Sequence, residues 1–199
     1  NAVMDACDKL HPTAEAHHRV MVVEVMGRDA GWVATVGGLA GGADIILVPE
    51  APFTIDEVCA RVRARHRRDR TFSIVVVSEG AKVAELGTQI VQETPVDAFG
   101  HVRLGGIGAV LAREIEARTG YECRVTVLGH LQRGGSPTVF DRVLATRFGV
   151  AAIGLIKEGQ FGHMVALRGK RIMAVPLEEA LSGTHQLDVD LYTIANLFT

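Results

Sequence analysis

The sequence has few aromatic residues, few cysteines and no long hydrophobic run. Aromatic residues make up 5% of the 199 positions, so a core must come mainly from aliphatic side chains. The three cysteines, Cys7, Cys59 and Cys123, form no CxxC pair, which argues against a disulfide framework or a zinc site. Apolar runs such as 20–23 are far shorter than the roughly 20 residues that a membrane span needs. We therefore expect a cytoplasmic protein with core cysteines, no metal site of its own and no membrane contact.

The sequence also lacks an excess of charge of either sign. Lys and Arg number 21 and Asp and Glu 23, which leaves a formal net charge of -2. Such a balance gives no overall field to draw the chain onto nucleic acid, so any anion must be bound locally. The basic run at 61–70 follows the apolar stripe Val58, Cys59 and Val62, and we interpret it as the solvated face of a helix.

Short β-branched runs alternate with helical segments through the first 128 residues. The expected strands lie at 19–25, 45–48, 73–77 and 125–128. Three helices are expected between them: one at 31–42, one that begins after the Thr54 cap, and one at 107–118. Four such alternations predict an α/β fold, a doubly wound parallel sheet with flanking helices. A long loop with Pro95 and Gly100 as breakers separates the third strand from the last helix.

The pattern changes after the fourth strand, and we expect three parts: an α/β domain at 1–135, a helical segment at 136–163 and a C-terminal tail at 164–199. The tail contains apolar runs at 164–167 and 172–175 and a final helix. Because no repeat or low-complexity linker separates the tail from the rest, we expect it to pack on the same body.

Three of the predicted strands run into polar or glycine-rich groups. These are Met26-Gly27-Arg28, Ser78-Glu79-Gly80 and Gly129-His130. Ligands of doubly wound sheets bind at the carboxyl ends of the strands, so we expect the three loops to line one crevice. Glu79 follows a run of buried-type residues, where a carboxylate needs hydrogen-bond donors such as sugar hydroxyls or an arginine partner.

The stretch LGHLQRGGSPTVFDR at 128–142 has the features of an anion site. We expect Ser136 to cap a helix that begins at Pro137, and free N–H groups at such an end attract anions. Arg133 supplies a planar fork for phosphate, and His130 supplies a second donor. A sugar phosphate fits this chemistry. The alternatives are a plain tight turn and an RNA-binding RGG segment, and the single copy between a strand and a helix disfavours RNA.

Other charged residues leave two interpretations open. Arg28 follows a strand-end glycine, where it can stabilise a transferring phosphoryl group or form a surface ion pair with Asp29 or Glu24. Arg19 and Arg124 border strands and are compatible with plain edge charges. No Ser-His-Asp spacing or carboxylate cage is evident, so nucleophilic catalysis is not indicated and any magnesium would be held largely by phosphates.

Two segments, VVEVMGRDAGWVA and VTVLGHLQRGGSPTVFDRVLATRFG, together resemble the 6-phosphofructokinases, in the style of actinobacterial members. The resemblance extends from Asn1 to near Pro176. It implies a glycolytic homo-oligomer, a dimer or tetramer, that transfers a phosphoryl group from ATP or pyrophosphate, with Mg²⁺, to the 1-hydroxyl of fructose 6-phosphate. The product is fructose 1,6-bisphosphate, and residues 1–135 would form the sugar-phosphate-binding half.

The resemblance also implies roles for single residues. Met26, Gly27 and Arg28 contact the sugar, and Arg28 is in addition a catalytic residue that stabilises the transferring phosphoryl group. Glu79 accepts hydrogen bonds from the sugar hydroxyls.

The remaining implied roles concern the phosphate end and the neighbouring subunit. The implied substrate-binding residues after the fourth strand are His130, Leu131, Gln132 and Arg133. Of these, His130 and Arg133 hold the 6-phosphate. Arg19 and Arg124 match arginines that the family donates across a subunit interface into the neighbour's site, so binding would require an oligomer.

The sequence departs from the family pattern in its donor motifs. The catalytic base of the family lies in a TIDND segment and its nucleotide and magnesium site in a GGDG-like loop, and neither occurs in these 199 residues. We therefore expect the donor site to lie outside this chain and the chain alone to have negligible kinase activity. The alternative is a non-catalytic sugar-phosphate-binding or regulatory subunit.

The effector pocket of allosteric bacterial members is matched only in part. Arg68 and Arg70 stand at matching positions, whereas Phe72, His11 and Asp44 replace other residues of the pattern. The resemblance therefore leaves regulation by nucleotides or phosphoenolpyruvate open.

Overall fold

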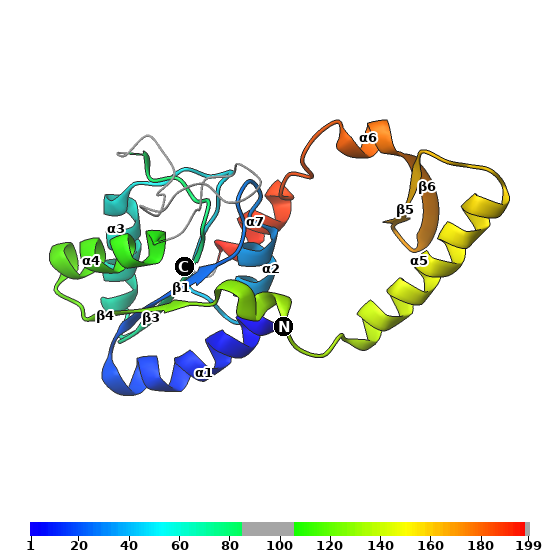
Figure 1. Ribbon diagram of the computed structural model, residues 1–199. Helices are drawn as coiled ribbons and strands as arrows, with labels where there is room; N and C mark the ends of the chain where they lie inside the picture. The colour runs from blue at the N-terminus through cyan, green and yellow to red at the C-terminus, as the bar shows by residue number, and fades with distance from the viewer. Residues whose placement is uncertain (85–105, 198–199) are drawn as a thin grey trace. The chain divides into compact units, whose positions relative to one another are not determined.

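The computed structural model describes residues 1–84 and 106–197, which form two compact units (Figure 1). The first unit joins Asn1–Arg133 to Gln186–Thr199, and the second is Gly134–His185. This division differs from the expected boundaries at 136 and 164, because the segment at 164–185 groups with the preceding helix. The predicted loop with Pro95 and Gly100 lies outside the described residues.

The first unit is built on a parallel four-stranded sheet of order β2-β3-β1-β4. Its elements are α1 (Ala2–His17), β1 (Val20–Val25), α2 (Trp32–Ala40), β2 (Ile45–Leu47), α3 (Ile55–His66), β3 (Ser73–Ser78), α4 (Ile107–Thr119), β4 (Cys123–Val127), the 3-10 helix η2 (Gly129–Arg133) and α7 (Val189–Ala195). The predicted doubly wound sheet is confirmed, and each predicted strand agrees with the observed one to within two residues.

Helices cover both faces of this sheet, as Figure 1 shows for α1 on one side and α3 and α4 on the other. Alternate strand residues face opposite layers: Val75 and Val77 pack with α3 and α4, and Ile74 and Val76 pack with α1 and α2. The strands β1 and β3 are buried along their whole length, which accounts for their nearly continuous apolar sequence.

The three cysteines are buried, as the sequence predicted, and each is free in the structure. Burial raises the pKa of the Cys7 thiol to about 11 and that of Cys123 to about 12. It also raises the pKa of Cys59. These residues act as small core side chains.

The second unit contains α5 (Val139–Lys157), the antiparallel hairpin of β5 (His163–Arg168) and β6 (Arg171–Pro176), and α6 (Leu177–Leu181). The α5 helix is the longest described one at 19 residues, but no helix within 1–84 or 106–197 is long and apolar enough to cross a membrane.

The predicted start of α5 at Ser136 and Pro137 is wrong. The N-cap is Thr138, whose Oγ1 accepts from the Asp141 N–H at 3.2 Å, while the Asp141 carboxylate accepts from the Thr138 N–H at 2.8 Å. This reciprocal capping box outweighs the preference of Ser and Pro for the two earlier positions. Because a carboxylate already occupies this helix end, the anion site expected there is not supported.

The first turns of α2, α3 and α4 also bind carboxylates of the chain. Glu50 accepts from the Gly31 N–H through both oxygens at 3.0 Å. The predicted capping box of α3 is confirmed, with Glu57 accepting from the Thr54 N–H at 2.8 Å. The third carboxylate, on Glu24 of β1, serves α4, which has no cap from its own N-cap side chain.

Glu24 is a buried charged residue, 3% exposed, near the carboxyl end of the inner strand β1. Its carboxylate accepts from the Gly106 N–H at 3.1 Å and from the Gly108 N–H at 2.8 Å. Glu24 is therefore a buried residue and not the surface partner that the ion-pair alternative for Arg28 assumed. A buried carboxylate is tolerated here because the helix end supplies donors and a partial positive charge.

We predict that Glu24→Ala lowers the free energy of unfolding by about 2–4 kcal/mol, because two charge-assisted hydrogen bonds are lost and two N–H groups are left without this partner. Urea unfolding followed by circular dichroism measures this. The matched control is the exposed Glu15 of α1, whose Glu15→Ala variant should stay within about 0.5 kcal/mol of the parent. Equal unfolding midpoints for the two variants would contradict the capping role.

Candidate functional site

The carboxyl edge of the sheet brings together the three loops that the sequence singled out. Strand β1 lies between β3 and β4, so loop 26–28 lies between loop 78–80 and η2. We call these three segments the three-loop site. The three strand ends lie at one edge of the sheet, as expected, and the crevice between the loops stays a prediction. Loop 26–28 is hydrogen-bonded to the backbone of loop 78–80 and to the Gln132 side chain of η2.

On the β3 side, Gly27 is bound through both of its backbone polar groups. Its N–H donates to Glu79 Oε1 at 3.3 Å, and its carbonyl accepts from Ser78 Oγ at 2.7 Å and from the Gly80 N–H at 2.9 Å. Glu79 thus has the hydrogen-bond donor that its position at the end of a buried strand requires.

Sequence reasoning did not single out Ser78 as a functional residue. Its side chain is fully buried, at 0% exposure, and its hydroxyl fixes the carbonyl of Gly27. The sequence signal for this role is a hydroxyl at the end of a predicted buried strand, because a buried hydroxyl needs a hydrogen-bond partner.

Two glycines allow loops 26–28 and 78–80 to come this close. A Cβ atom on Gly80 would lie 1.9 Å from the Arg28 carbonyl oxygen, and a Cβ on Gly27 would lie 2.4 Å from Ser78 Oγ. Gly27 also has a φ of +149°, a conformation that side chains with a Cβ rarely adopt. Neither position accommodates a larger residue without moving backbone.

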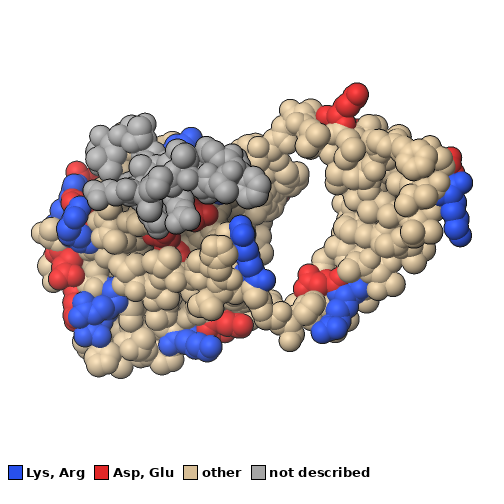
Figure 2. Space-filling view, viewed as in Figure 1, with Lys and Arg blue, Asp and Glu red and all other residues tan. Residues whose placement is uncertain are grey.

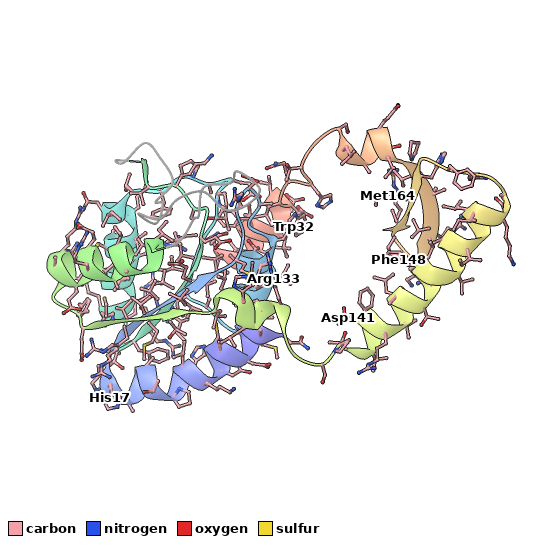
Figure 3. All side chains as sticks on the ribbon, in the orientation of Figure 1. His17, Trp32, Arg133, Asp141, Phe148 and Met164 are labelled. Atoms are coloured by element: carbon pink, nitrogen blue, oxygen red, sulfur yellow. The ribbon has the colours of Figure 1, made fainter. Side chains whose placement is uncertain are left out.

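On the β4 side, the side chain of Gln132 connects loop 26–28 to η2. Its Oε1 accepts from the Met26 N–H at 3.3 Å, and its Nε2 donates to the Gly129 carbonyl at 3.1 Å. Three other residues of η2, His130, Leu131 and Arg133, are exposed. Figure 3 labels Arg133 on η2.

The three-loop site carries an excess of positive side chains. Arg28 and Arg133 contribute guanidinium groups and His130 an imidazole, against the single carboxylate of Glu79. Elsewhere on the face in Figure 2, Lys and Arg lie in separate groups with acidic residues between them, so no continuous basic patch is visible there. Such an arrangement can bind one compact anion with adjoining hydroxyls, and it does not resemble a nucleic-acid surface.

Arg19 and Arg124 lie at the opposite end of the strands from the three-loop site. Arg19 immediately precedes β1, and Arg124 pairs in register with Met21 near the beginning of that strand. At about 3.3 Å per residue, the six steps from Arg19 to Val25 give about 20 Å, and the four steps from Arg124 to Leu128 give about 13 Å.

Both arginines pair with one carboxylate. Arg19 Nε binds Glu122 Oε2 at 2.8 Å, and an Arg124 guanidinium nitrogen binds Glu122 Oε1. The hydrogen bond from Arg19, more than any other contact, lowers the pKa of Glu122.

Three residues of the partly matched effector pocket, Asp44, His11 and Phe72, make contacts within the protein. Asp44 pairs with Arg65 at 2.6 Å and accepts from the Ile74 N–H at 2.8 Å. Burial raises the pKa of the Asp44 carboxyl, and these two contacts oppose that rise. The His11 ring packs edge-to-face on Phe72, with 5.7 Å between the ring centres. The three residues that depart from the family pattern are therefore engaged in internal contacts.

Within the described ranges, no group of three or more His, Cys, Asp and Glu side chains could hold a metal ion.

Comparison with known proteins identifies the family. The family model for phosphofructokinase matches residues 1–156. The chain belongs to the phosphofructokinase family. The resemblance inferred from the two sequence segments is confirmed.

Named relatives of this phosphofructokinase chain include proteins with different donors. The pyrophosphate–fructose 6-phosphate 1-phosphotransferase of Streptomyces coelicolor is 52% identical over 194 residues, which cover 98% of this chain and 56% of the relative. The ATP-dependent 6-phosphofructokinase 1 of Synechocystis is 51% identical, covering 96% of this chain and 52% of the relative. The ATP-dependent 6-phosphofructokinase of Mycobacterium tuberculosis is 55% identical, covering 89% and 51%. The chain thus spans about half the length of the curated relatives it matches.

Solved phosphofructokinase structures share the fold. The Saccharomyces cerevisiae phosphofructokinase matches with a TM-score of 0.75 and 34% identity over 91% of this chain and 22% of that chain. The pyrophosphate-dependent enzyme of Marinobacter aquaeolei matches with a TM-score of 0.77 over 94% of this chain and 47% of that chain, and at 24% identity it supports the fold alone.

We predict that Gly80→Ala lowers the free energy of unfolding by about 1–3 kcal/mol, because the new methyl group overlaps the Arg28 carbonyl and forces backbone to shift. Thermal and urea unfolding measure the loss. Gly149→Ala is the control, since a Cβ on this α5 glycine would meet nothing within 4 Å. That variant should gain up to about 1 kcal/mol of helix stability, and a Gly80→Ala variant as stable as the parent would disprove the close contact.

Proposed function

We propose that the three-loop site binds fructose 6-phosphate and that this chain is the acceptor-binding half of a phosphofructokinase. The reaction is transfer of a phosphoryl group to the 1-hydroxyl of fructose 6-phosphate, a step of glycolysis, which places the enzyme in the cytoplasm. The observation that carries this proposal is the meeting of loop 26–28, loop 78–80 and η2 at one sheet edge, in a chain of this family.

The two sides of the site bind different parts of the substrate. His130 and Arg133, exposed on η2, hold the 6-phosphate through charge-assisted hydrogen bonds. Glu79, fixed by the Gly27 N–H, accepts from sugar hydroxyls with its remaining lone pairs. Arg28 lies between these two sides and stabilises the negative charge that spreads over the phosphoryl oxygens during transfer.

The phosphoryl donor is ATP or pyrophosphate, because relatives of nearly equal similarity are named for each. Mg²⁺ accompanies such donors and neutralises phosphate charge. The described residues hold no carboxylate cage for it, so the donor and its metal are bound by residues other than these.

Arg19 and Arg124 serve the site of a neighbouring subunit in a homodimer or homotetramer. Their distances of about 20 Å for Arg19 and about 13 Å for Arg124 from the carboxyl edge of their own sheet support this, because neither side chain spans that length. Pairing with Glu122 fixes both guanidinium groups at one end of the sheet.

A non-catalytic sugar-phosphate-binding subunit is the second candidate. Like the first candidate, it accounts for the absence of TIDND and GGDG motifs from these residues. Assays of the 199-residue chain with fructose 6-phosphate and either donor separate activity from binding. If the chain binds fructose 6-phosphate without turnover and gains turnover when a donor-binding half is added, it is the acceptor half of an enzyme. If it binds fructose 6-phosphate but no donor-binding half produces turnover, it is a binding subunit.

We predict that Arg133→Ala weakens fructose 6-phosphate binding by about 1.5–3 kcal/mol, or about 10-fold to 150-fold, the scale of a charge-assisted hydrogen bond. Isothermal titration calorimetry measures the affinity. Arg67→Ala, which removes an exposed arginine after α3, should leave the affinity unchanged. Equal affinities for the parent and Arg133→Ala would remove Arg133 from the phosphate site.

We predict that Arg28→Ala lowers kcat by about 100-fold or more in an enzyme that joins this chain to a donor-binding half, because the interaction is made in the transition state. Steady-state kinetics with varied fructose 6-phosphate measure kcat and KM separately. A raised KM with normal kcat would instead make Arg28 a binding residue only.

A further inference from the structure

We infer that Gln132 is a positioning residue, whose carboxamide holds loop 26–28 and η2 at a fixed separation instead of binding the sugar phosphate. The inference rests on the proposed function, because it concerns the same site. It differs from the role that the family resemblance implied, in which Gln132 belongs to the substrate-binding residues.

Both ends of the Gln132 carboxamide are engaged by backbone groups. Oε1 accepts from the Met26 N–H at 3.3 Å, and Nε2 donates to the Gly129 carbonyl at 3.1 Å. The side chain is half-buried, while its neighbours Leu131 and Arg133 are exposed. The amide therefore points into the protein, whereas the adjoining side chains point toward solvent.

The location of these bonds explains why they matter. The backbone ladder between β1 and β4 ends where the Leu128 N–H donates to the Glu24 carbonyl at 3.0 Å. Beyond that point the Gln132 carboxamide takes the place of a backbone peptide group. It joins Met26, which follows β1, to Gly129, which follows β4. It thus extends the connection between the two strands into the site itself.

This connection sets the geometry of the site. Met26 precedes the glycine and arginine of loop 26–28, and Gly129 precedes His130 of η2. A brace between Met26 and Gly129 therefore fixes the sugar side relative to the phosphate side before the ligand arrives. Preorganisation of this kind lowers the ordering cost of binding.

These two hydrogen bonds require one side chain that both accepts and donates, which favours glutamine. A glutamate keeps the acceptor for the Met26 N–H but loses the donor for the Gly129 carbonyl, and a methionine of similar length loses both. An exposed glutamine of the same unit, Gln186, offers a matched comparison. The Gln132→Met and Gln186→Met variants make the same chemical change at the two positions.

The first measurement uses the 199-residue chain without ligand. Amide hydrogen exchange by NMR should show the Met26 N–H exchanging about 3-fold to 10-fold faster in Gln132→Met than in the parent, and unchanged in Gln186→Met. In the parent, the Gln132 Nε2 hydrogens should exchange more slowly than those of Gln186, a comparison that needs no variant. Unchanged Met26 exchange together with equal side-chain exchange would overturn the inference.

The second measurement is fructose 6-phosphate affinity by calorimetry. Gln132→Met should bind about 3-fold to 10-fold more weakly than the parent, and Gln186→Met should bind equally well. Faster Met26 exchange with unchanged affinity would overturn the positioning role, as would weaker affinity with unchanged Met26 exchange, which is the signature of a direct ligand. A parent chain that binds no fructose 6-phosphate refutes the proposed function instead, and the exchange data then still decide whether the brace exists.

Discussion

The close contact between loop 26–28 and its two neighbours is the constraint on which the site depends. The Gly27 carbonyl accepts two hydrogen bonds from the β3 side, and the Met26 N–H donates one to the β4 side. These bonds exist only because Gly27 and Gly80 lack a Cβ and because β1 lies between β3 and β4. A central loop bound on both sides places charged side chains accurately although none of them lies within a strand or a long helix.

The rest of the first unit maintains this contact. Two helical layers bury both faces of the sheet, so the strand ends have little freedom to shift. Glu24 adds a link between the central strand and α4, and its carbonyl also receives the Leu128 N–H just before η2. The residues at the end of β1 therefore take part in core packing, in the capping of α4 and in the geometry of the site. A substitution among these residues affects all three.

Much of this could be predicted from the sequence, and the failures have two physical causes. Short runs of β-branched residues predict the four strands. The Thr54 capping box is predictable because its two partners are only three residues apart. Ser78 and Glu24 were missed because their partners are backbone groups 51 and 82 or more positions away. The start of α5 was misplaced because two local signals competed and the Thr138 box prevailed. Residue types reveal which side chains need partners, whereas only the fold reveals which backbone groups supply them.

The helix N-termini have a consequence for how phosphate is recognised. Each helix that follows a strand of the parallel sheet already holds a carboxylate of the chain at its first turn, from Glu50, Glu57, Glu24 and Asp141 on α2, α3, α4 and α5. Many sheets of this type use those helix ends as anion receptors, but here the dipoles are neutralised internally. In the proposed function, phosphate is recognised instead by exposed side chains of η2, whose electrostatic attraction is screened by dissolved ions. The proposed site therefore ties affinity for fructose 6-phosphate to the ionic strength of the surrounding medium.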